Sequence, residues 1–123
     1  MSLFKDLCLI NAPARGEREA ADYVVKVLKD MGLEVWEDAA GGAVGGNSGN
    51  VLALLKGTKP GAPRIFLSAH LDTVEPTVGL KIIEEEGRLS SDGTTILGAD
   101  DKGGMAPAIE AIRLIQESGE PHG

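Results

Sequence analysis

A helix-like pattern that passes into a strand-like pattern through the single residue Gly32 constrains the fold of this chain more than any other feature. Between residues 17 and 31 the apolar side chains recur at helical spacing, which predicts a helix with one apolar face. Residues 33–36 then follow the two-residue period of a strand. Gly32 is a natural end for the helix, because glycine readily adopts the left-handed conformation found there. This compact connection predicts a domain of interleaved helices and strands.

The rest of the chain continues the same alternation. Apolar runs at residues 51–55 and 65–67 are typical of strands covered on both faces. Residues 81–84 and 88–90 predict a hairpin that turns through Gly87. A second helix is predicted from about residue 104 to residue 118, and its broad apolar face should be covered by a sheet. The predicted fold class is therefore α/β.

The glycine-rich segment at residues 41–49 invites comparison with a phosphate-binding loop. Its glycines, however, do not follow the G-x-G-x-x-G spacing, and no Gly-Lys-Ser/Thr sequence follows them. The next segment has the pattern of a strand, whereas a phosphate loop opens a helix. We expect a flexible connection here.

Composition excludes several classes of function. The 123 residues include 12 Lys and Arg against 19 Asp and Glu, a net charge of −7, which argues against binding nucleic acid. No apolar run approaches the roughly 20 residues that span a bilayer, so no membrane association is predicted. Lys5 and Asp6 interrupt the N-terminal region where a signal peptide would be apolar. The single cysteine, Cys8, cannot form an internal disulfide and is predicted to lie in the core, so we expect a cytoplasmic protein.

The first segment that could carry chemistry directly follows the predicted strand at residues 65–67. His70 and Asp72 are two residues apart, so they would share one face at the carboxyl end of that strand. Open α/β sheets place their sites at this edge. A metal-bound imidazole also needs a carboxylate or carbonyl on its other nitrogen. The alternative is a buried histidine whose polar atoms are satisfied by a nearby acid.

The second segment places Asp100 and Asp101 among small residues at the N-terminus of the second predicted helix. An aspartate that caps the helix would explain one of these acids. Two adjacent carboxylates must be held apart or neutralised, and a bound cation would neutralise them. Capping and cation binding both remain open at this point.

The sequence His-Leu-Asp-Thr-Val at residues 70–74, followed by Gly-Ala-Asp-Asp-Lys-Gly-Gly at residues 98–104, resembles the metal-binding signature of the dinuclear zinc exopeptidases. This family includes peptidase T, the glutamate carboxypeptidases, acetylornithine deacetylase and the aminoacylases. Residues 91–102 are especially similar to peptidase T-like members, and shorter matches at 13–17 and 49–51 extend the similarity over nearly the whole chain. The resemblance implies the N-terminal portion of a catalytic domain, with a mixed sheet flanked by helices.

The resemblance also implies roles for individual residues. His70 would bind one zinc ion, Asp100 would bridge both, and Asp72 would serve the catalytic site by orienting His70. The family further implies a cis peptide bond between Asp100 and Asp101. Asp101 and Lys102 match the motif, but we assign them no chemistry. The metal is expected to be zinc, two ions per complete site, although His and Asp ligands would also accept Co²⁺ or Mn²⁺.

Other parts of the family's catalytic machinery have no match in these 123 residues. A Glu-Glu pair that supplies the general base, a further acid, a distant histidine and the lid domain are all without a counterpart. His122 is interpreted as a surface or loop histidine. Two protein ligands cannot close two zinc sites of four or more positions each. We therefore expect residues 1–123 to be the N-terminal part of a single metallopeptidase catalytic domain that hydrolyses no peptide alone.

Several expectations about partners and alternatives follow. The substrate of the complete enzyme would be a small peptide, with a tripeptide first, then a dipeptide, a C-terminal residue or an N-acyl amino acid. An incomplete sheet would leave an open edge that invites self-association, and the full-length protein could be a homodimer. The alternatives are a stand-alone, non-catalytic binding or regulatory module derived from this fold, and an acidic α/β domain with fortuitous motifs.

Overall fold

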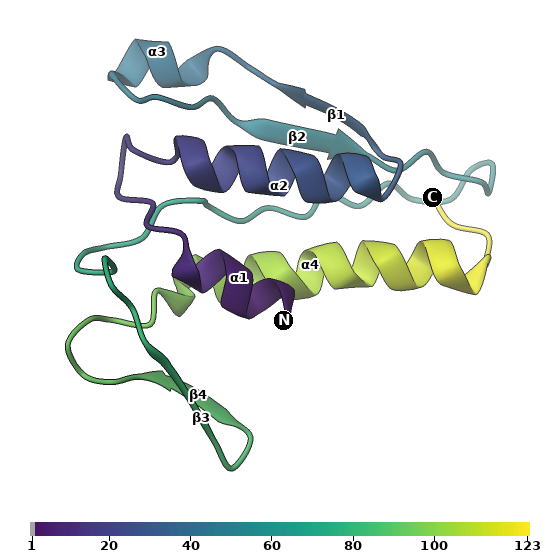
Figure 1. Ribbon diagram of the computed structural model, residues 1–123. Coiled ribbons are helices and arrows are strands. Elements are labelled where there is room, and N and C mark those ends of the chain that lie inside the picture. Colours follow the sequence, from purple (N-terminus) through teal and green to yellow (C-terminus); the bar gives the residue numbers. More distant parts are fainter. Residues whose placement is uncertain (1) are drawn as a thin grey trace.

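The computed structural model describes residues 2–123. Helices and strands are interleaved along the chain, as the sequence predicts (Figure 1). The elements are α1 (Leu3–Leu9), α2 (Arg18–Asp30), β1 (Glu34–Glu37), α3 (Ala40–Val44), β2 (Val51–Leu54), β3 (Ile82–Glu85), β4 (Arg88–Ser91) and α4 (Ala99–Ser118). The helix α1 has no counterpart among the predicted elements, because its seven residues are too few for a clear periodicity.

The core lies where α1, α2 and α4 meet. Figure 1 shows α2 between the β1–β2 pair on one side and α4 on the other, with α1 against α4. Cys8 is fully buried, which confirms its predicted place in the core. The buried apolar cluster consists of Leu7, Val24, Leu28, Leu33, Met105, Ala106 and Ile109. Helix packing, rather than a large sheet, therefore provides most of the buried apolar surface in this part of the chain.

The predicted strands on either side of the glycine-rich segment are present and pair with each other. β1 and β2 are antiparallel, with Glu34 opposite Leu54 and Glu37 opposite Val51. The segment between them is more ordered than predicted, because part of it forms the short helix α3, which ends at Gly45 in a left-handed conformation. Gly41 approaches the backbone of Ser48 closely. The glycines here allow a compact connection rather than a flexible one.

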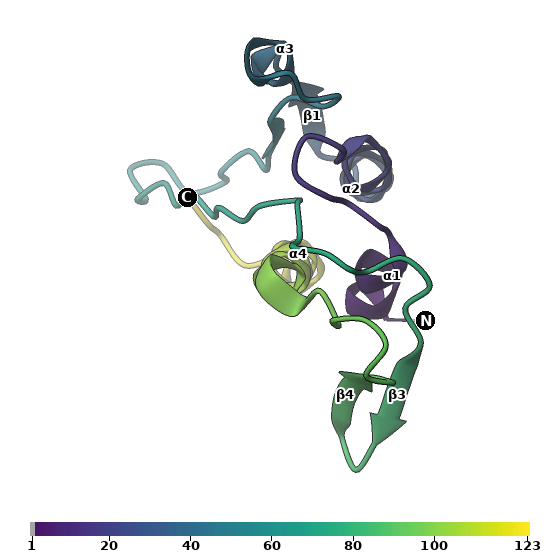
Figure 2. The ribbon, with the colours of Figure 1, turned by 90° about the vertical axis from the view of Figure 1, so that its left-hand side faces the viewer.

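The predicted hairpin around Gly87 is confirmed. β3 and β4 pair antiparallel from Ile82 opposite Ser91 to Glu85 opposite Arg88. Glu86 and Gly87 both have positive φ, of 50° and 75°, as a tight hairpin turn requires. The hairpin projects away from the three packed helices (Figure 2).

The predicted strand at residues 65–67 is not formed in this structure. The segment is extended, but Ile65 and Phe66 are 82% and 81% exposed. A strand exists only through a ladder of hydrogen bonds to a neighbour, and the paired strands among residues 2–123 are β1 with β2 and β3 with β4. The strands thus form two antiparallel pairs rather than one continuous mixed sheet.

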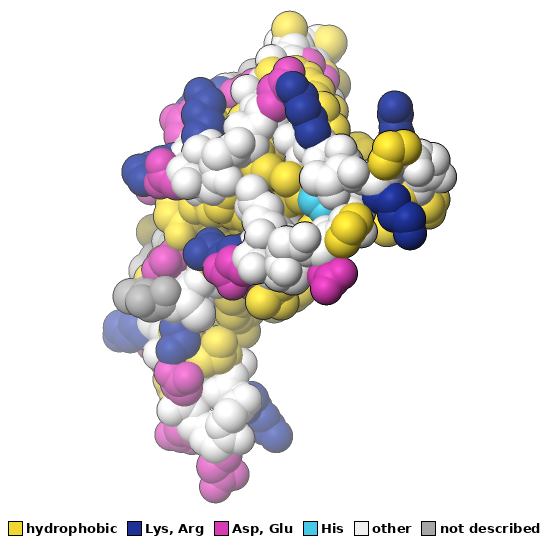
Figure 3. Space-filling view, turned by 90° about the vertical axis from the view of Figure 1, so that its right-hand side faces the viewer, with side chains coloured by type: hydrophobic (Ala, Val, Ile, Leu, Met, Phe, Trp, Pro, Cys, Tyr) yellow, Lys and Arg dark blue, Asp and Glu magenta, His cyan; other side chains and the backbone are white. Residues whose placement is uncertain are grey.

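The apolar face of α4 is also covered differently from the expectation. Helix α1, not a sheet, packs against it, and Leu114 in its C-terminal half remains 63% exposed. Figure 3 shows hydrophobic side chains exposed among charged ones on the side of the molecule where the C-terminus lies. None of the helices formed by residues 2–123 has the length and apolar character needed to cross a membrane.

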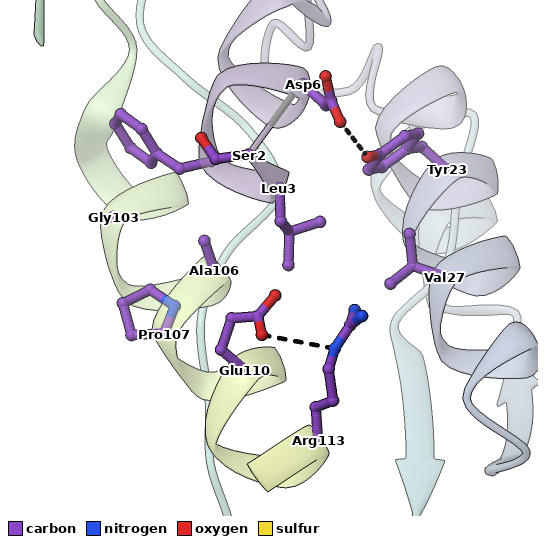
Figure 4. A pocket seen from close by; sticks show the side chains of 11 residues that line it. Ser2, Leu3, Asp6, Tyr23, Val27, Gly103, Ala106, Pro107, Glu110 and Arg113 are labelled. Carbon is purple, nitrogen blue, oxygen red and sulfur yellow. Dashed lines mark hydrogen bonds and ion pairs between the residues drawn. The ribbon is translucent and has the colours of Figure 1, made fainter.

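A pocket opens where α1, α2 and α4 meet (Figure 4). Four of its polar side chains form two pairs: the Tyr23 hydroxyl donates to Asp6 over 3.1 Å, and Arg113 contacts Glu110 at 3.4 Å. Apolar side chains, such as those of Leu3 and Val27, form the rest of the wall. The histidine and aspartates of the two sequence motifs lie elsewhere.

Candidate metal centre

The first motif lies at the end of the extended segment that follows Phe66. Leu71 packs against the helical core, so the residues on either side of it, His70 and Asp72, point to the opposite, solvent-facing side. The backbone N–H of Thr73 donates to the carbonyl oxygen of Ala12 over 2.8 Å and fixes the end of the segment. His70 and Asp72 thus share a face, as predicted, although the segment is not part of a sheet.

The two motifs meet at His70. Its Nδ1 lies 2.9 Å from the backbone carbonyl oxygen of Asp72 and 3.1 Å from the Asp72 Oδ1. Its Nε2 lies 3.1 Å from the Oδ1 of Asp100, which belongs to the first turn of α4. The structure therefore brings together the three predicted site residues, which are far apart in the sequence.

These contacts determine which ring nitrogen carries the proton. Both partners of Nδ1 are acceptors, so Nδ1 must donate, and Nε2 of the neutral ring then presents a lone pair to the Asp100 carboxylate. Two lone pairs facing each other at 3.1 Å require a proton or a cation between them. Burial lowers the pKa of His70, but the hydrogen bonds to Asp100 and Asp72 outweigh it and raise that pKa above its usual value.

The adjacent acids Asp100 and Asp101 have different surroundings. The backbone of α4 is interrupted at Asp100 and Asp101, whose φ and ψ are not helical, and the Oδ1 of Asp101 accepts the backbone N–H of Gly104 over 3.1 Å. This is the contact of an aspartate that caps the continuous part of the helix after the interruption. The side chain of Asp100 is 95% exposed and faces His70. The peptide bond between the two acids is cis, which confirms the expectation from the family resemblance. One acid therefore caps the helix, and the other remains available to a ligand.

The donor atoms fit a metal ion. Zinc binds imidazole nitrogen and carboxylate oxygen at about 2.0–2.2 Å, so two such donors on one tetrahedral ion lie about 3.3 Å apart. The separation of 3.1 Å between His70 Nε2 and Asp100 Oδ1 is close to this value. Among residues 2–123, however, no group of three or more His, Cys, Asp or Glu side chains could hold a metal ion. His70 and Asp100 thus fit as part of a coordination sphere.

Lys102 received no role in the sequence analysis, but its surroundings in the structure are unusual. Its side chain is completely buried, and its Nζ donates to the backbone carbonyl of Ile10 over 2.7 Å. Burial lowers the pKa of this ammonium group, and the nearby Cys8 partly offsets the effect. A charged residue beside two aspartates gives no sign in the sequence that it points into the core. His122 lies near the C-terminal end, where its backbone carbonyl accepts N–H groups of Thr58 and Lys59.

The chain matches no protein-family model. It is 39% identical over 120 residues to the protein YqjE of Bacillus subtilis (strain 168), a match that covers 98% of this chain and 32% of that protein. Among solved structures, the aminopeptidase PepT from Bacillus cereus ATCC 10987 superimposes with a TM-score of 0.93 at 41% identity, over 98% of this chain and 32% of that one.

A tripeptidase from Staphylococcus aureus subsp. aureus Mu50 also superimposes, with a TM-score of 0.90 at 34% identity and the same coverage of both chains. The resemblance to peptidase T-like exopeptidases is thereby confirmed, as is the α/β class, here as part of a catalytic domain. The chain spans about a third of the length of the relatives it matches.

Proposed function

We propose that the chain is the N-terminal part of the catalytic domain of a peptidase T-like metallo-exopeptidase, and that it contributes the first ligands of a two-zinc site. The observation that carries the proposal is the contact between His70 Nε2 and Asp100 Oδ1 at 3.1 Å, with Nδ1 held by Asp72. Similarity to an aminopeptidase and a tripeptidase supports the reaction class, hydrolysis of small peptides.

Each residue of the site has a separate task in this proposal. Asp72 accepts a hydrogen bond from the Nδ1–H of His70, and this holds the ring in the tautomer whose Nε2 can bind a metal. Asp100 presents an exposed carboxylate to the same place, while Asp101 is engaged as a helix cap. A pair of zinc ions in such a site lowers the pKa of water toward neutrality and polarises the substrate carbonyl.

We also propose that residues 1–123 alone hydrolyse no peptide. His70 and Asp100 together fill two positions, whereas a catalytic zinc has three protein ligands and a water. The general base would also have to come from another part of a longer protein, as would the lid that covers the substrate. Tripeptides are the first candidate substrates, and dipeptides, C-terminal residues and N-acyl amino acids follow. We propose a cytoplasmic location for the complete enzyme.

Zinc binding and peptide hydrolysis test the two parts of this proposal separately. In isothermal titration calorimetry with ZnCl₂, the chain should bind zinc, and His70→Ala and Asp100→Ala should each abolish the signal. Glu85→Gln, which changes an exposed acid on β3, serves as the matched control and should bind like the parent. Zinc binding that persists in both alanine variants would refute the site.

A tripeptide assay with the same zinc-loaded chain should show no turnover. Turnover that disappears in His70→Ala would mean that the chain is catalytically complete. Absence of any zinc binding by the parent chain would refute the proposed metal site.

A further inference from the structure

Three polar residues within the described part of the chain are buried although they do not face the candidate metal centre. They are Thr73, Thr77 and Lys102, with exposures of 4%, 3% and 0%. Burying a polar group is unfavourable unless it is hydrogen-bonded, and burying an ammonium group is far more so. The partners of these residues therefore show what their burial accomplishes.

All three residues bind consecutive positions of one short segment, residues 10–12, which follows α1. Lys102 Nζ donates to the carbonyl oxygen of Ile10 over 2.7 Å, and the Thr77 hydroxyl donates to Asn11 Oδ1 over 2.5 Å. The hydroxyl of Thr73 has no hydrogen-bond partner among the described residues, so Thr73 holds the segment through its backbone, whose N–H donates to the carbonyl oxygen of Ala12 over 2.8 Å. Ala12 is itself fully buried, while Ile10 and Asn11 are half-buried.

The 10–12 segment joins the two halves of the candidate metal centre. Thr73 directly follows Asp72, and Lys102 lies two residues after Asp100. Thr73 also approaches Gly98, at the start of α4, where a Cβ would lie 3.4 Å from the Thr73 Cγ2. Gly98 has φ of +72°, a conformation that disfavours any larger residue there. The two motifs are thus held against the same piece of backbone.

We propose that Lys102 is a positioning residue of the metal centre: by binding the Ile10 carbonyl it fixes the first turn of α4 to the 10–12 segment, and so sets the separation of Asp100 from His70. The inference rests on the proposed function, because Lys102 can affect catalysis only if His70 and Asp100 bind the metal. A hydrogen bond from a charged donor is stronger and shorter than a neutral one, so it resists small displacements of the turn. Thr77 and Thr73 hold the same segment from the side of the first motif.

The test compares Lys102→Met with two other variants. The comparison distinguishes an effect on the placement of the metal ligands from a general loss of folding stability. Methionine keeps the length of the buried side chain but removes its charge and donor. Thr77→Val likewise removes the hydroxyl bound to Asn11 and preserves the shape. Leu7→Ala is the matched control, because it weakens the packing of α1 but leaves every hydrogen bond to the 10–12 segment in place.

We expect Lys102→Met to weaken zinc binding about tenfold in calorimetry, which is typical for outer residues that orient metal ligands. Thr77→Val should weaken it by roughly threefold, a smaller effect because its hydrogen bond is neutral. Leu7→Ala should lower the melting temperature and leave zinc affinity within about twofold of the parent. Unchanged zinc affinity in folded Lys102→Met would overturn the proposal, as would an equal loss in Leu7→Ala.

A second measurement does not depend on zinc. The ¹⁵N chemical shifts of the His70 ring in the metal-free chain report its contacts to Asp72 and Asp100. The Nε2 signal should shift in Lys102→Met and in Thr77→Val, and remain unchanged in Leu7→Ala. Failure of the parent to bind zinc would refute the proposed function, while these shifts would still decide the positioning role. If Lys102→Met does not fold, an unchanged Nε2 signal in Thr77→Val would contradict the proposal.

Discussion

Arg18 and Glu37 form a two-bonded ion pair that links the start of α2 to the end of β1: Nη1 and Nη2 each donate to one carboxylate oxygen over 2.8 Å. Glu37 also accepts the backbone N–H of Gly49 over 2.7 Å. These hydrogen bonds, with that of Arg18 the strongest, lower the pKa of Glu37 to about 2. The same pairing raises the pKa of Arg18. Glu37 therefore connects the helix, the strand and the glycine-rich connection.

The Arg18–Glu37 pair predicts an acid-sensitive contribution to stability. The Glu37 pKa is lower in the folded chain than its unfolded value near 4.5, so the contribution is present above about pH 4.5 and lost as pH falls toward 2. Because the pair is partly exposed, we expect it to contribute about 1 kcal/mol to the free energy of unfolding. Urea unfolding of the parent and Glu37→Gln should differ by this amount at pH 7 and converge near pH 2. A difference that persists unchanged at pH 2 would contradict the assignment.

Two neighbouring glycines of α3 should respond oppositely to alanine. A Cβ on Gly41 would lie 1.8 Å from the backbone oxygen of Ser48, whereas one on Gly42 would have no atom within 4 Å. Gly41→Ala should destabilise the chain by about 2 kcal/mol through overpacking. Gly42→Ala should be neutral or stabilise it by up to about 1 kcal/mol, since alanine favours helix. Thermal unfolding followed by circular dichroism measures both, and equal effects would refute the close approach.

Metal binding should be visible as thermal stabilisation. With free Zn²⁺ at 100 times the dissociation constant, the folded state should gain about 2.7 kcal/mol, and EDTA should reverse the gain. Co²⁺ and Mn²⁺ should stabilise less than Zn²⁺, in keeping with their weaker affinity for nitrogen and oxygen ligands. His70→Ala should melt at the same temperature with and without metal. Stabilisation that survives this substitution would place the metal elsewhere.

The exposed apolar segment at residues 65–67 predicts self-association. Ile65 and Phe66 are more than four-fifths exposed in an extended segment, which resembles an unprotected sheet edge. We expect sedimentation velocity to show dimers or larger species that increase with concentration. Phe66→Lys should shift the distribution toward monomer, while Val78→Lys, at another exposed apolar position, should not. A monomer at all concentrations would contradict the expectation.

The sequence predicted those features that depend on neighbouring residues. The apolar periodicity of residues 17–31 became α2, the alternating residues after Gly32 became β1, and the turn at Gly87 became the β3–β4 hairpin. The two motifs also predicted which side chains would meet, since His70, Asp72 and Asp100 lie in contact. Local propensity was sufficient for the helices and strands, whereas the site residues followed from the resemblance of the two motifs to a known family.

The sequence is thus sufficient for the α/β class and for most of the helices and strands, and its family resemblance adds the candidate metal ligands. The tertiary structure alone decided that residues 65–67 stay unpaired, because a strand needs a neighbour that periodicity does not specify. It also decided that Lys102 turns into the core to bind Ile10, a contact between residues 92 positions apart. Such contacts depend on how α1 and α4 pack, and no pattern within either segment encodes that arrangement.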